Sequence, residues 1–411
     1  MKIFKRILII LLVVLLLAQI PFIYRRYQTG KLAEKIASLD AQRTTYQDPN
    51  FKEYKGIIHA HTNLGGHSTG SFDELIAAAN ANDLDFVLMT EHFSETFDTA
   101  EKTLNGVYGK TLFVGGNEID TSDGDRFLLI PGGGEAARWR MSGTAAFLKA
   151  AHLSNQLALI TYPEKFKSWD SNFDGVEVFN LHTAAKQMNW LTALGDLIWS
   201  YPSYPELTFA KNFQRPDANL AKFDEIASQQ ALLNCLSGAP GCRLVLTAGA
   251  DAHSDLGLHL IGSDGGQKLI NIKLDPYETI FRIARIHVWL PVGTELYPES
   301  LISAIRQGDF FIGLDALGDT TGFVFRKQFA AYPIDNPQHV DSFTSFEAKA
   351  PFKARFVFFR NGEKVAERPD SATAELRDPR LGVYRVEVYR DDLGPPFDKM
   401  PWIISNPIYV R

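Results

Sequence analysis

Short apolar stretches alternate with longer amphipathic ones from Tyr54 to Gln307, and this alternation restricts the fold more than any other feature of the chain. The apolar stretches predict β-strands over 54–59, 85–90, 111–116, 126–130, 157–161, 175–180, 244–248 and 268–274. The amphipathic stretches predict helices over 71–82, 144–154, 184–200, 218–233, 277–284 and 298–307. Ser71 and Glu74 form a capping-box sequence at the start of the first helix. Strands that alternate with helices predict an α/β protein, either a barrel or a doubly wound sheet.

Histidines and carboxylates follow several of these strands. The residues in question are His59, His61, His67, His92, Glu118, Asp251 and His253. In a (β/α) barrel the carboxyl ends of the strands meet at the catalytic rim, so we expect these side chains to lie close together. Imidazole nitrogens and carboxylate oxygens are common ligands of divalent metals. Any one of these residues could instead cap a helix or bond a loop, but the set as a whole predicts a metal centre.

The motifs resemble those of the PHP family, which is named after polymerase and histidinol phosphatase members. The resemblance covers roughly residues 50–315 and rests on His59-Ala60-His61-Thr62, Thr90-Glu91-His92, Glu118 and Asp251-Ala252-His253. It implies a distorted (β/α)7 barrel that holds up to three metal ions, commonly zinc, manganese or iron. Most characterised members of that family hydrolyse phosphoesters, so the resemblance implies a metal-dependent hydrolase.

By the same resemblance, a first metal is bound by His59, His61 and Asp251, and Glu118 bridges this metal to a second. Two or three divalent ions lower the pKa of bound water and bind phosphoryl oxygens. Asp251 is then expected to accept a proton from that water. Glu118, the bridging carboxylate, is expected to be a second catalytic residue.

A third metal is expected at His67, His92 and His253. The eight-residue offset from His59 to His67 matches the spacing in members with three metals. This offset makes the match more specific than a lone His-x-His motif would be.

Two positions depart from the family pattern. Glu91 stands where the family usually has aspartate, and Tyr162 replaces the histidine that would bind the second metal. Tyrosine has a reference pKa of about 10 and is a poor ligand unless ionised, so Tyr162 is a candidate to donate a hydrogen bond to substrate. His182 follows the strand that contains Glu177 and is the alternative ligand, or else a solvent-facing residue at a helix start.

An uncharged apolar run extends from Ile7 to Tyr24, with basic residues on both sides. Eighteen helical residues at about 1.5 Å each span roughly 27 Å, which is close to the thickness of a bilayer core. The alternative is a cleaved signal peptide, but Ala18-Gln19-Ile20 matches the usual cleavage site poorly. The sequence therefore favours a single-pass anchor in residues 1–24 and a spacer over residues 25–50.

The basic residues Lys2, Lys5 and Arg6 predict that the amino end lies in the cytoplasm. The body would then lie outside the inner or cytoplasmic membrane, in the periplasm or its equivalent.

Charge and cysteine content bear on the partners and on the compartment. The formal net charge of -6 gives no reason to expect nucleic acid as a partner. Cys235 and Cys242 bracket a turn-forming segment and predict a disulfide, which fits an oxidising compartment. Two unrelated buried thiols are the alternative. The oligomeric state is left open.

Residues after about 320 change in character. Short β-like stretches lie at 355–360, 363–368, 373–376, 383–389 and 405–410. Asn361-Gly362 is a strong hairpin signal between the first two. We therefore expect a barrel domain over residues 51–320 and a small antiparallel β-sandwich over residues 321–411.

The function predicted from the sequence is metal-dependent hydrolysis of a small-molecule or phosphoester substrate outside the cytoplasm. A non-catalytic envelope binding or scaffold protein with a degraded metal site is one alternative, because Tyr162 weakens the second site. A non-phosphate hydrolase on the same metals is another, since the chain has no glycine-rich phosphate loop.

Overall fold

The computed structural model describes residues 2–43, 46–134, 141–233, 243–255, 257–259, 271–329 and 343–410. Cys235 and Cys242 lie outside these ranges, so the disulfide stays a prediction.

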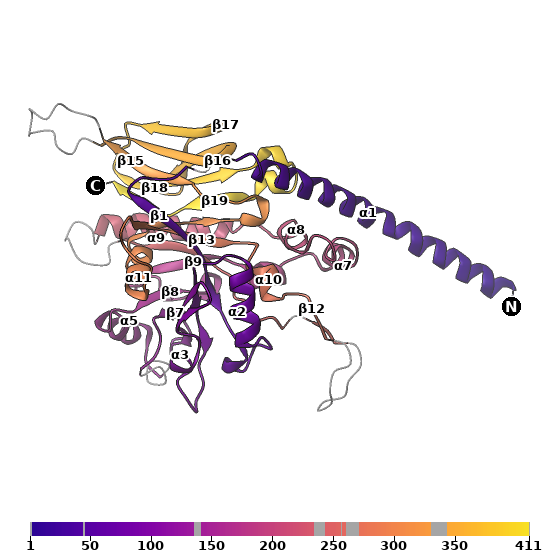
Figure 1. Ribbon diagram of the computed structural model, residues 1–411, viewed down its shortest axis with the longest axis horizontal. Helices are drawn as coiled ribbons and strands as arrows, with labels where there is room; N and C mark the ends of the chain where they lie inside the picture. Colours follow the sequence, from indigo (N-terminus) through magenta and orange to yellow (C-terminus); the bar gives the residue numbers. More distant parts are fainter. Residues whose placement is uncertain are drawn as a thin grey trace, which may run out of the picture.

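Within the described residues, the body is built mainly from two sheets (Figure 1). The main path of the larger sheet is β15 (Val324–Phe329), β16 (Phe343–Arg360), β18 (Gly382–Tyr389), β19 (Pro401–Ser405), β14 (Phe310–Gly313), β13 (Arg285–Pro291), β1 (Phe51–Ala60), β2 (Phe86–Met89), β5 (Thr111–Val114) and β4 (Gly106–Tyr108). Strand β17 (Glu363–Arg377) pairs with β16, and β20 (Ile408–Val410) pairs with β18. The smaller sheet has the order β10 (Val245–Gly249), β9 (Gly175–Asn180), β8 (Leu157–Ile160), β7 (Arg126–Ile130), β6 (Asn117–Asp120) and β3 (Glu91–His92). A separate pair consists of β11 (Gly257–His259) and β12 (Asn271–Lys273).

The end of β1 lies beside the end of β10 and joins the two sheets. Ala250 N donates to Ile58 O at 2.9 Å, and His61 N donates to Ala252 O at 3.0 Å. Ala60 and Ala252 form an isolated parallel bridge. Because β1 and β10 are far apart in sequence, these bonds bring the first and last predicted metal motifs together.

The helices connect the strands along the chain (Figure 1). They are α2 (Phe72–Ala81), α3 (Thr99–Lys102), α5 (Thr144–Leu153), α6 (Leu181–Lys186), α7 (Trp190–Trp199), α8 (Pro205–Ala210), α9 (Asp217–Leu233), α10 (Tyr277–Ile280) and α11 (Pro298–Gln307). Short 3₁₀ turns are η1 (Asn63–Gly65), η2 (Pro163–Lys165), η4 (Asp315–Leu317), η6 (Asp391–Leu393) and η7 (Phe397–Lys399). The mixed α/β class predicted from the sequence is confirmed.

Local signals explain the helix boundaries. Both capping-box bonds form between Ser71 and Glu74, as the sequence predicts. The helix expected over 184–200 is in fact two helices, because the Asn189 side chain accepts hydrogen bonds from the amides of Leu191 and Thr192 and starts α7 anew.

The C-terminal β-rich part shares a sheet with the rest of the body. Asn361 and Gly362 have φ values of 50° and 82°, the backbone required by a two-residue hairpin between β16 and β17. Strand β19 pairs with β14 through Phe311 opposite Ser405 and Ile312 opposite Ile404. The expected sandwich is therefore corrected in one respect: its strands continue the sheet that contains β1, because β14 pairs with β13 on one side and with β19 on the other.

Helix α1 (Lys2–Asp40) is continuous through the segment for which the sequence predicts a spacer. Of the helices that the structure describes, it is long and apolar enough to cross a membrane, although a signal sequence would meet the same criterion. Its second half docks on the body, with Ile36 buried and Arg25 paired to the buried Asp196. This pairing docks the polar half of α1 on the body, in the segment for which the sequence predicts a spacer.

Candidate metal centre

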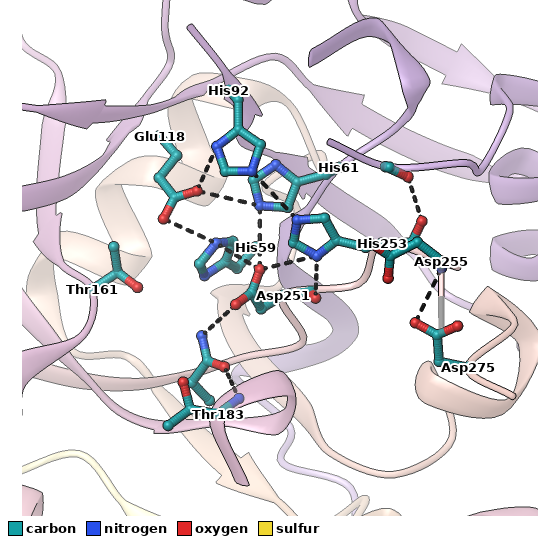
Figure 2. A network of polar contacts seen from close by, with 12 residues as sticks. His59, His61, His92, Glu118, Thr161, Thr183, Asp251, His253, Asp255 and Asp275 are labelled. Atoms are coloured by element: carbon teal, nitrogen blue, oxygen red, sulfur yellow. Dashed lines mark hydrogen bonds and ion pairs between the residues drawn. The ribbon is translucent and has the colours of Figure 1, made fainter. Parts of the chain in front are cut away.

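Four strands bring the candidate ligands to one place (Figure 2). His59 and His61 lie at the end of β1, His92 ends β3, Glu118 is in β6, and Asp251 and His253 follow β10. Pairing of β3 with β6 sets His92 directly beside Glu118.

Left-handed backbone turns orient two of these residues. His59 has φ 70° and Asp251 has φ 46°, values that side-chain-bearing residues rarely adopt. The pairing of β1 with β2 shifts register between Ile58 and Ala60, which is a bulge at His59. Such strained positions cluster at functional sites, where surrounding contacts hold them.

One group of ligand atoms surrounds Asp251. Its Oδ1 lies 3.3 Å from His59 Nε2 and 3.4 Å from His61 Nε2. Glu118 Oε1 lies 3.9 Å from His59 Nε2, and its Oε2 lies 3.6 Å from His61 Nε2. All four side chains are buried.

His61 also belongs to a second group. Its ring stacks on those of His92 and His253, with centroid distances of 4.3 and 4.4 Å. The Nε2 atoms of His92 and His253 are 3.4 Å apart. His92 Nδ1 lies 2.9 Å from Glu118 Oε2, so Glu118 reaches both groups.

Several of these buried atoms have no hydrogen-bond partner. They are His59 Nε2, both ring nitrogens of His61, Glu118 Oε2 and Asp251 Oδ1. Each unsatisfied buried polar atom costs about 1–3 kcal/mol, so five in one place need an explanation. Ligands at about 2.0–2.1 Å around a tetrahedral ion lie about 3.3–3.4 Å from one another, and the pairs made by Asp251 have this spacing. The donor set therefore fits a divalent metal ion.

Glu177 fixes the orientation of His59. Its Oε1 lies 2.7 Å from His59 Nδ1, and both side chains are fully buried. The carboxylate accepts the Nδ1 proton, so Nε2, which faces Asp251 and Glu118, is the nitrogen that a cation would bind. Thr161 and Asn180 donate to the other oxygen of Glu177 at 2.6 and 2.8 Å, so the carboxylate is held in place. Metal-binding histidines commonly have such a carboxylate partner.

His253 is oriented in a similar way by backbone. Its Nδ1 donates to the carbonyl oxygen of Asp251 at 2.9 Å, which leaves Nε2 for the ligand group. Asp251 likewise uses one carboxylate oxygen for hydrogen bonds and leaves the other without a partner. Its Oδ2 accepts from Tyr162 Oη at 2.8 Å and from Asn180 Nδ2 at 3.2 Å, while Oδ1 stays free.

The charges of the site follow from burial and from close neighbours. Burial raises the pKa of the Glu118 and Asp251 carboxyls, but the surrounding imidazoles outweigh it and hold both pKa values well below their ordinary range. Burial lowers the pKa of His61 to about 3, so this ring is neutral and able to bind metal. Burial lowers the pKa of His59 as well, but Glu177 and Asp251 more than offset this and raise it, so a proton occupies Nε2 of this ring where no cation does. The centre thus concentrates negative charge that a cation would neutralise.

Tyr162 is a neutral phenol in this structure. Burial and the charges of Asp251 and Glu118 raise its pKa far above its ordinary value. The residue has φ 53°, which turns its hydroxyl toward Asp251. It therefore acts as a hydrogen-bond donor to a ligand carboxylate, and an ionised phenolate ligand is disfavoured.

His67 and His182 lie at the edge of the centre. The ring of His67 is 5.0 Å from that of His92, and the ring of His182 is 5.2 Å from that of His253. Both line an open pocket of about 400 Å³ in front of Glu118 and His253. The structure brings both near the ligand groups and leaves them outside the tight clusters formed by the other candidates.

Two cations share this pocket with the carboxylates. Arg126 donates to Asp120 through Nε and Nη2 at 2.6 and 3.0 Å, and its Nη1 lies 3.4 Å from Glu118 Oε1. Its guanidinium carbon is 5.4 Å from the centroid of the Tyr162 ring. Lys186, on α6, lines the same pocket.

Sequence reasoning did not assign roles to Glu177, Asn180, Thr161 or Arg126. A signal for Glu177 existed: it is a single carboxylate within Gly175–Asn180, an otherwise apolar strand that is buried throughout. A buried charge needs a partner, so its position alone implied one. The partner itself depends on tertiary contacts, since His59 is on another strand.

No protein-family model matches the chain, and no curated protein does. Among solved structures it is similar to a two-domain protein containing a predicted PHP-like metal-dependent phosphoesterase from Bacteroides vulgatus ATCC 8482. The identity is 11%, the TM-score is 0.35, and the match covers 90% of this chain and 99% of that one. It is also similar to PsfC from Pseudomonas syringae PB-5123, at 12% identity and a TM-score of 0.33, over 62% of this chain and 90% of that one. The first structure bears the family name to which the motifs point. Both TM-scores are below 0.5, and neither likeness decides what this chain binds.

Proposed function

We propose that this protein is a metal-dependent hydrolase that acts on phosphoesters. The observation that carries the proposal is the convergence of buried, unpaired ligand atoms from His59, His61 and Asp251. A site with this much ionised and unsatisfied polarity is costly without a bound cation.

The ligands divide between two groups that share Glu118. His59, His61 and Asp251 would hold one ion, and His92 with His253 would hold another, with His67 able to complete it. His182 is the candidate for a further position. When bound, such ions make hydroxide available near neutral pH and neutralise charge on phosphoryl oxygens. Zinc, manganese and iron all suit this mixture of imidazole and carboxylate.

The residues around the ligands define what the pocket accepts. Arg126 and Lys186 present positive charge at its wall, which suits an anionic phosphoester better than a neutral ester or amide. Tyr162 and Asn180 hold Asp251 through one oxygen, which leaves the other oxygen free to bind metal or to accept a proton. Asp251 remains our candidate for the base.

The fold and location belong to the same proposal. We take the strands of residues 51–320 as a distorted (β/α)7 barrel, supported by the bonds from Ile58 and His61 to the residues after β10. Residues 321–411 would be an accessory β domain. The apolar part of α1 would anchor the chain in the inner or cytoplasmic membrane, with the body outside. Three basic residues, Lys2, Lys5 and Arg6, precede the span and two, Arg25 and Arg26, follow it, which supports this orientation.

The test uses full-length protein purified in detergent without chelator. Elemental analysis should find two or three equivalents of divalent metal, and phosphomonoesters or phosphodiesters should be hydrolysed faster with added manganese or zinc. The double substitution His59→Ala/His61→Ala should remove both metal and activity.

Two results would count against the proposal. One is protein that carries no metal and gains no turnover from any of the ions. The other is metal that binds normally while carboxylic esters, and no phosphoesters, are hydrolysed.

A further inference from the structure

Helix α7 presents an apolar face that no other described part of the chain covers. Trp190, Leu191, Leu194 and Ile198 are 74, 56, 49 and 59% exposed. At about 100° per residue, these four side chains lie within an arc of about 100° on one side of the helix. Four large apolar residues on one helical face are unusual for a surface in contact with water.

The apolar face adjoins the membrane-spanning part of α1. Gly195 of α7 packs so closely against Phe22 that an added Cβ would lie 2.1 Å from the Phe22 ring. Trp199 Nε1 donates to Gln19 Oε1 at 2.9 Å. Gln19 and Phe22 lie within the apolar run of α1, so α7 runs beside the last turns of the segment that would lie in the bilayer.

Polar contacts fix α7 and α1 relative to each other. Asp196 is fully buried and binds Arg25 of α1, with Arg25 Nε 3.0 Å from its Oδ1, and Lys211 Nζ lies 2.9 Å from the same oxygen. Lys211 also donates to Thr29 Oγ1 at 3.2 Å. These contacts hold α1 as a rigid extension of the body, and in Figure 1 α7 and α8 lie on the side from which α1 projects.

We infer that the exposed face of α7 lies in the interfacial region of the lipid bilayer, next to the anchor. The inference rests on the proposed membrane anchor, and it adds that the body itself contacts lipid. We assign lipid to this face because the apolar surface of α7 continues that of α1, and the two surfaces meet at Gly195 and Phe22. Tyr24 and Tyr27 are 60 and 55% exposed on α1, and together with Trp190 they supply aromatic residues of the kind found at membrane–water interfaces.

The consequence for the metal centre is a fixed distance from the membrane. Helix α6, which carries His182 and Lys186 of the pocket, is joined to α7 through residues 187–189. A body that is held by both α1 and α7 cannot rotate freely about its anchor.

The test is spin-label depth measurement on the full chain in phosphatidylcholine–phosphatidylglycerol nanodiscs. In a Cys235→Ser/Cys242→Ser background that retains metal and activity, single labels are introduced by Leu194→Cys, Leu153→Cys or Ile10→Cys. Leu153 is 81% exposed at the end of α5 and serves as the matched control, because α5 and α1 lie on opposite sides of the body in Figure 1. Oxygen collides with labels in lipid, and a water-soluble nickel chelate collides with labels in water.

We expect the oxygen-to-nickel collision ratio at Leu194 to be several-fold above that at Leu153 and close to that at Ile10. A Leu194 ratio equal to that of Leu153, with Ile10 in lipid, would refute the inference and leave the anchor intact. Water at both Leu194 and Ile10 would refute the anchor as well. Spin–spin broadening at Leu194 that disappears when labelled protein is diluted with unlabelled protein would show a second copy on this face, and would also refute the inference.

Discussion

Glu177 Oε1 lies 2.7 Å from His59 Nδ1, and this contact between two fully buried side chains determines which nitrogen of His59 is free for a metal. Glu53 and His287 make the same contact at 2.7 Å outside the metal centre. The chain therefore supplies its own comparison between a histidine–carboxylate pair that serves a ligand and one that serves the fold.

Glu177→Gln should weaken metal binding. The amide no longer favours the Nδ1-protonated tautomer of His59, and loss of such a partner typically lowers metal affinity by about 10- to 100-fold. Competition titration with a metal-binding dye on full-length protein measures the change. Glu53→Gln is the matched control, and it should lower thermal stability while leaving metal affinity unchanged. Equal metal affinities in wild type and Glu177→Gln would show that the contact is only structural.

Tyr162→Phe should keep metal and lose activity. The substitution removes one hydrogen bond to the ionised Asp251, and a bond to a charged group is worth about 1.5–3 kcal/mol, so kcat/KM should fall by roughly ten- to a hundredfold. Steady-state kinetics on a phosphoester, with metal content measured in parallel, check this result.

Tyr162→His distinguishes an adapted centre from a degraded one. Since the tyrosine hydroxyl holds Asp251 in the structure, we expect activity that is unchanged or lower. A large gain in hydrolysis would instead mean that tyrosine marks a lost metal site.

Arg126→Met should reduce the use of anionic substrates. Its guanidinium is held by Asp120 at the pocket wall, so removal takes away a preformed positive charge. We expect kcat/KM for phosphomonoesters to fall by about tenfold or more, with a smaller loss in Arg126→Lys. Turnover of a neutral acetate ester, if measurable, should change little. Equal losses on charged and neutral substrates would point to a general disturbance of the centre.

His287 should make stability depend on pH. Burial lowers the pKa of His287, but Asp315 and Glu53 outweigh it and raise the pKa to about 9. Because the folded-state pKa exceeds the ordinary value of 6.5, the contribution is complete below pH 6.5 and is lost as pH rises toward about 9. Its size over this window is about 3 kcal/mol. Thermal denaturation between pH 6 and 9 should show this loss in wild type and a flatter profile in His287→Gln. Parallel profiles in the two proteins would contradict the assignment.

Asp196→Ala should loosen α1 from the body. The carboxylate binds Arg25 and Lys211, and Lys211 is nearly buried, so its removal leaves positive charges without a partner. Removing one partner of a buried pair costs about 3 kcal/mol or more. We expect a lower melting temperature and faster proteolysis between residues 25 and 40, measured on detergent-solubilised protein. Asp217→Ala, at an exposed pair with Arg215, provides the control and should have little effect.

The sequence by itself determined most of the local structure. Apolar periodicity predicted β7 and β9 at their observed bounds, Ser71 and Glu74 predicted the start of α2, and Asn361-Gly362 predicted its hairpin. It also singled out the histidines and carboxylates that meet at the candidate metal centre. These signals are local, because periodicity, capping and turn preferences depend on neighbouring residues.

Tertiary structure decided the relations between distant segments. The pairing of Glu177 with His59, the hydrogen bond from Tyr162 to Asp251, and the docking of α7 against α1 each join residues from separate elements. The continuation of β14 by β19, where the sequence predicts a separate sandwich, is a pairing of the same kind. Such contacts depend on which strand ends and helix faces meet when the chain folds, and the order of residues in any one segment does not contain that information.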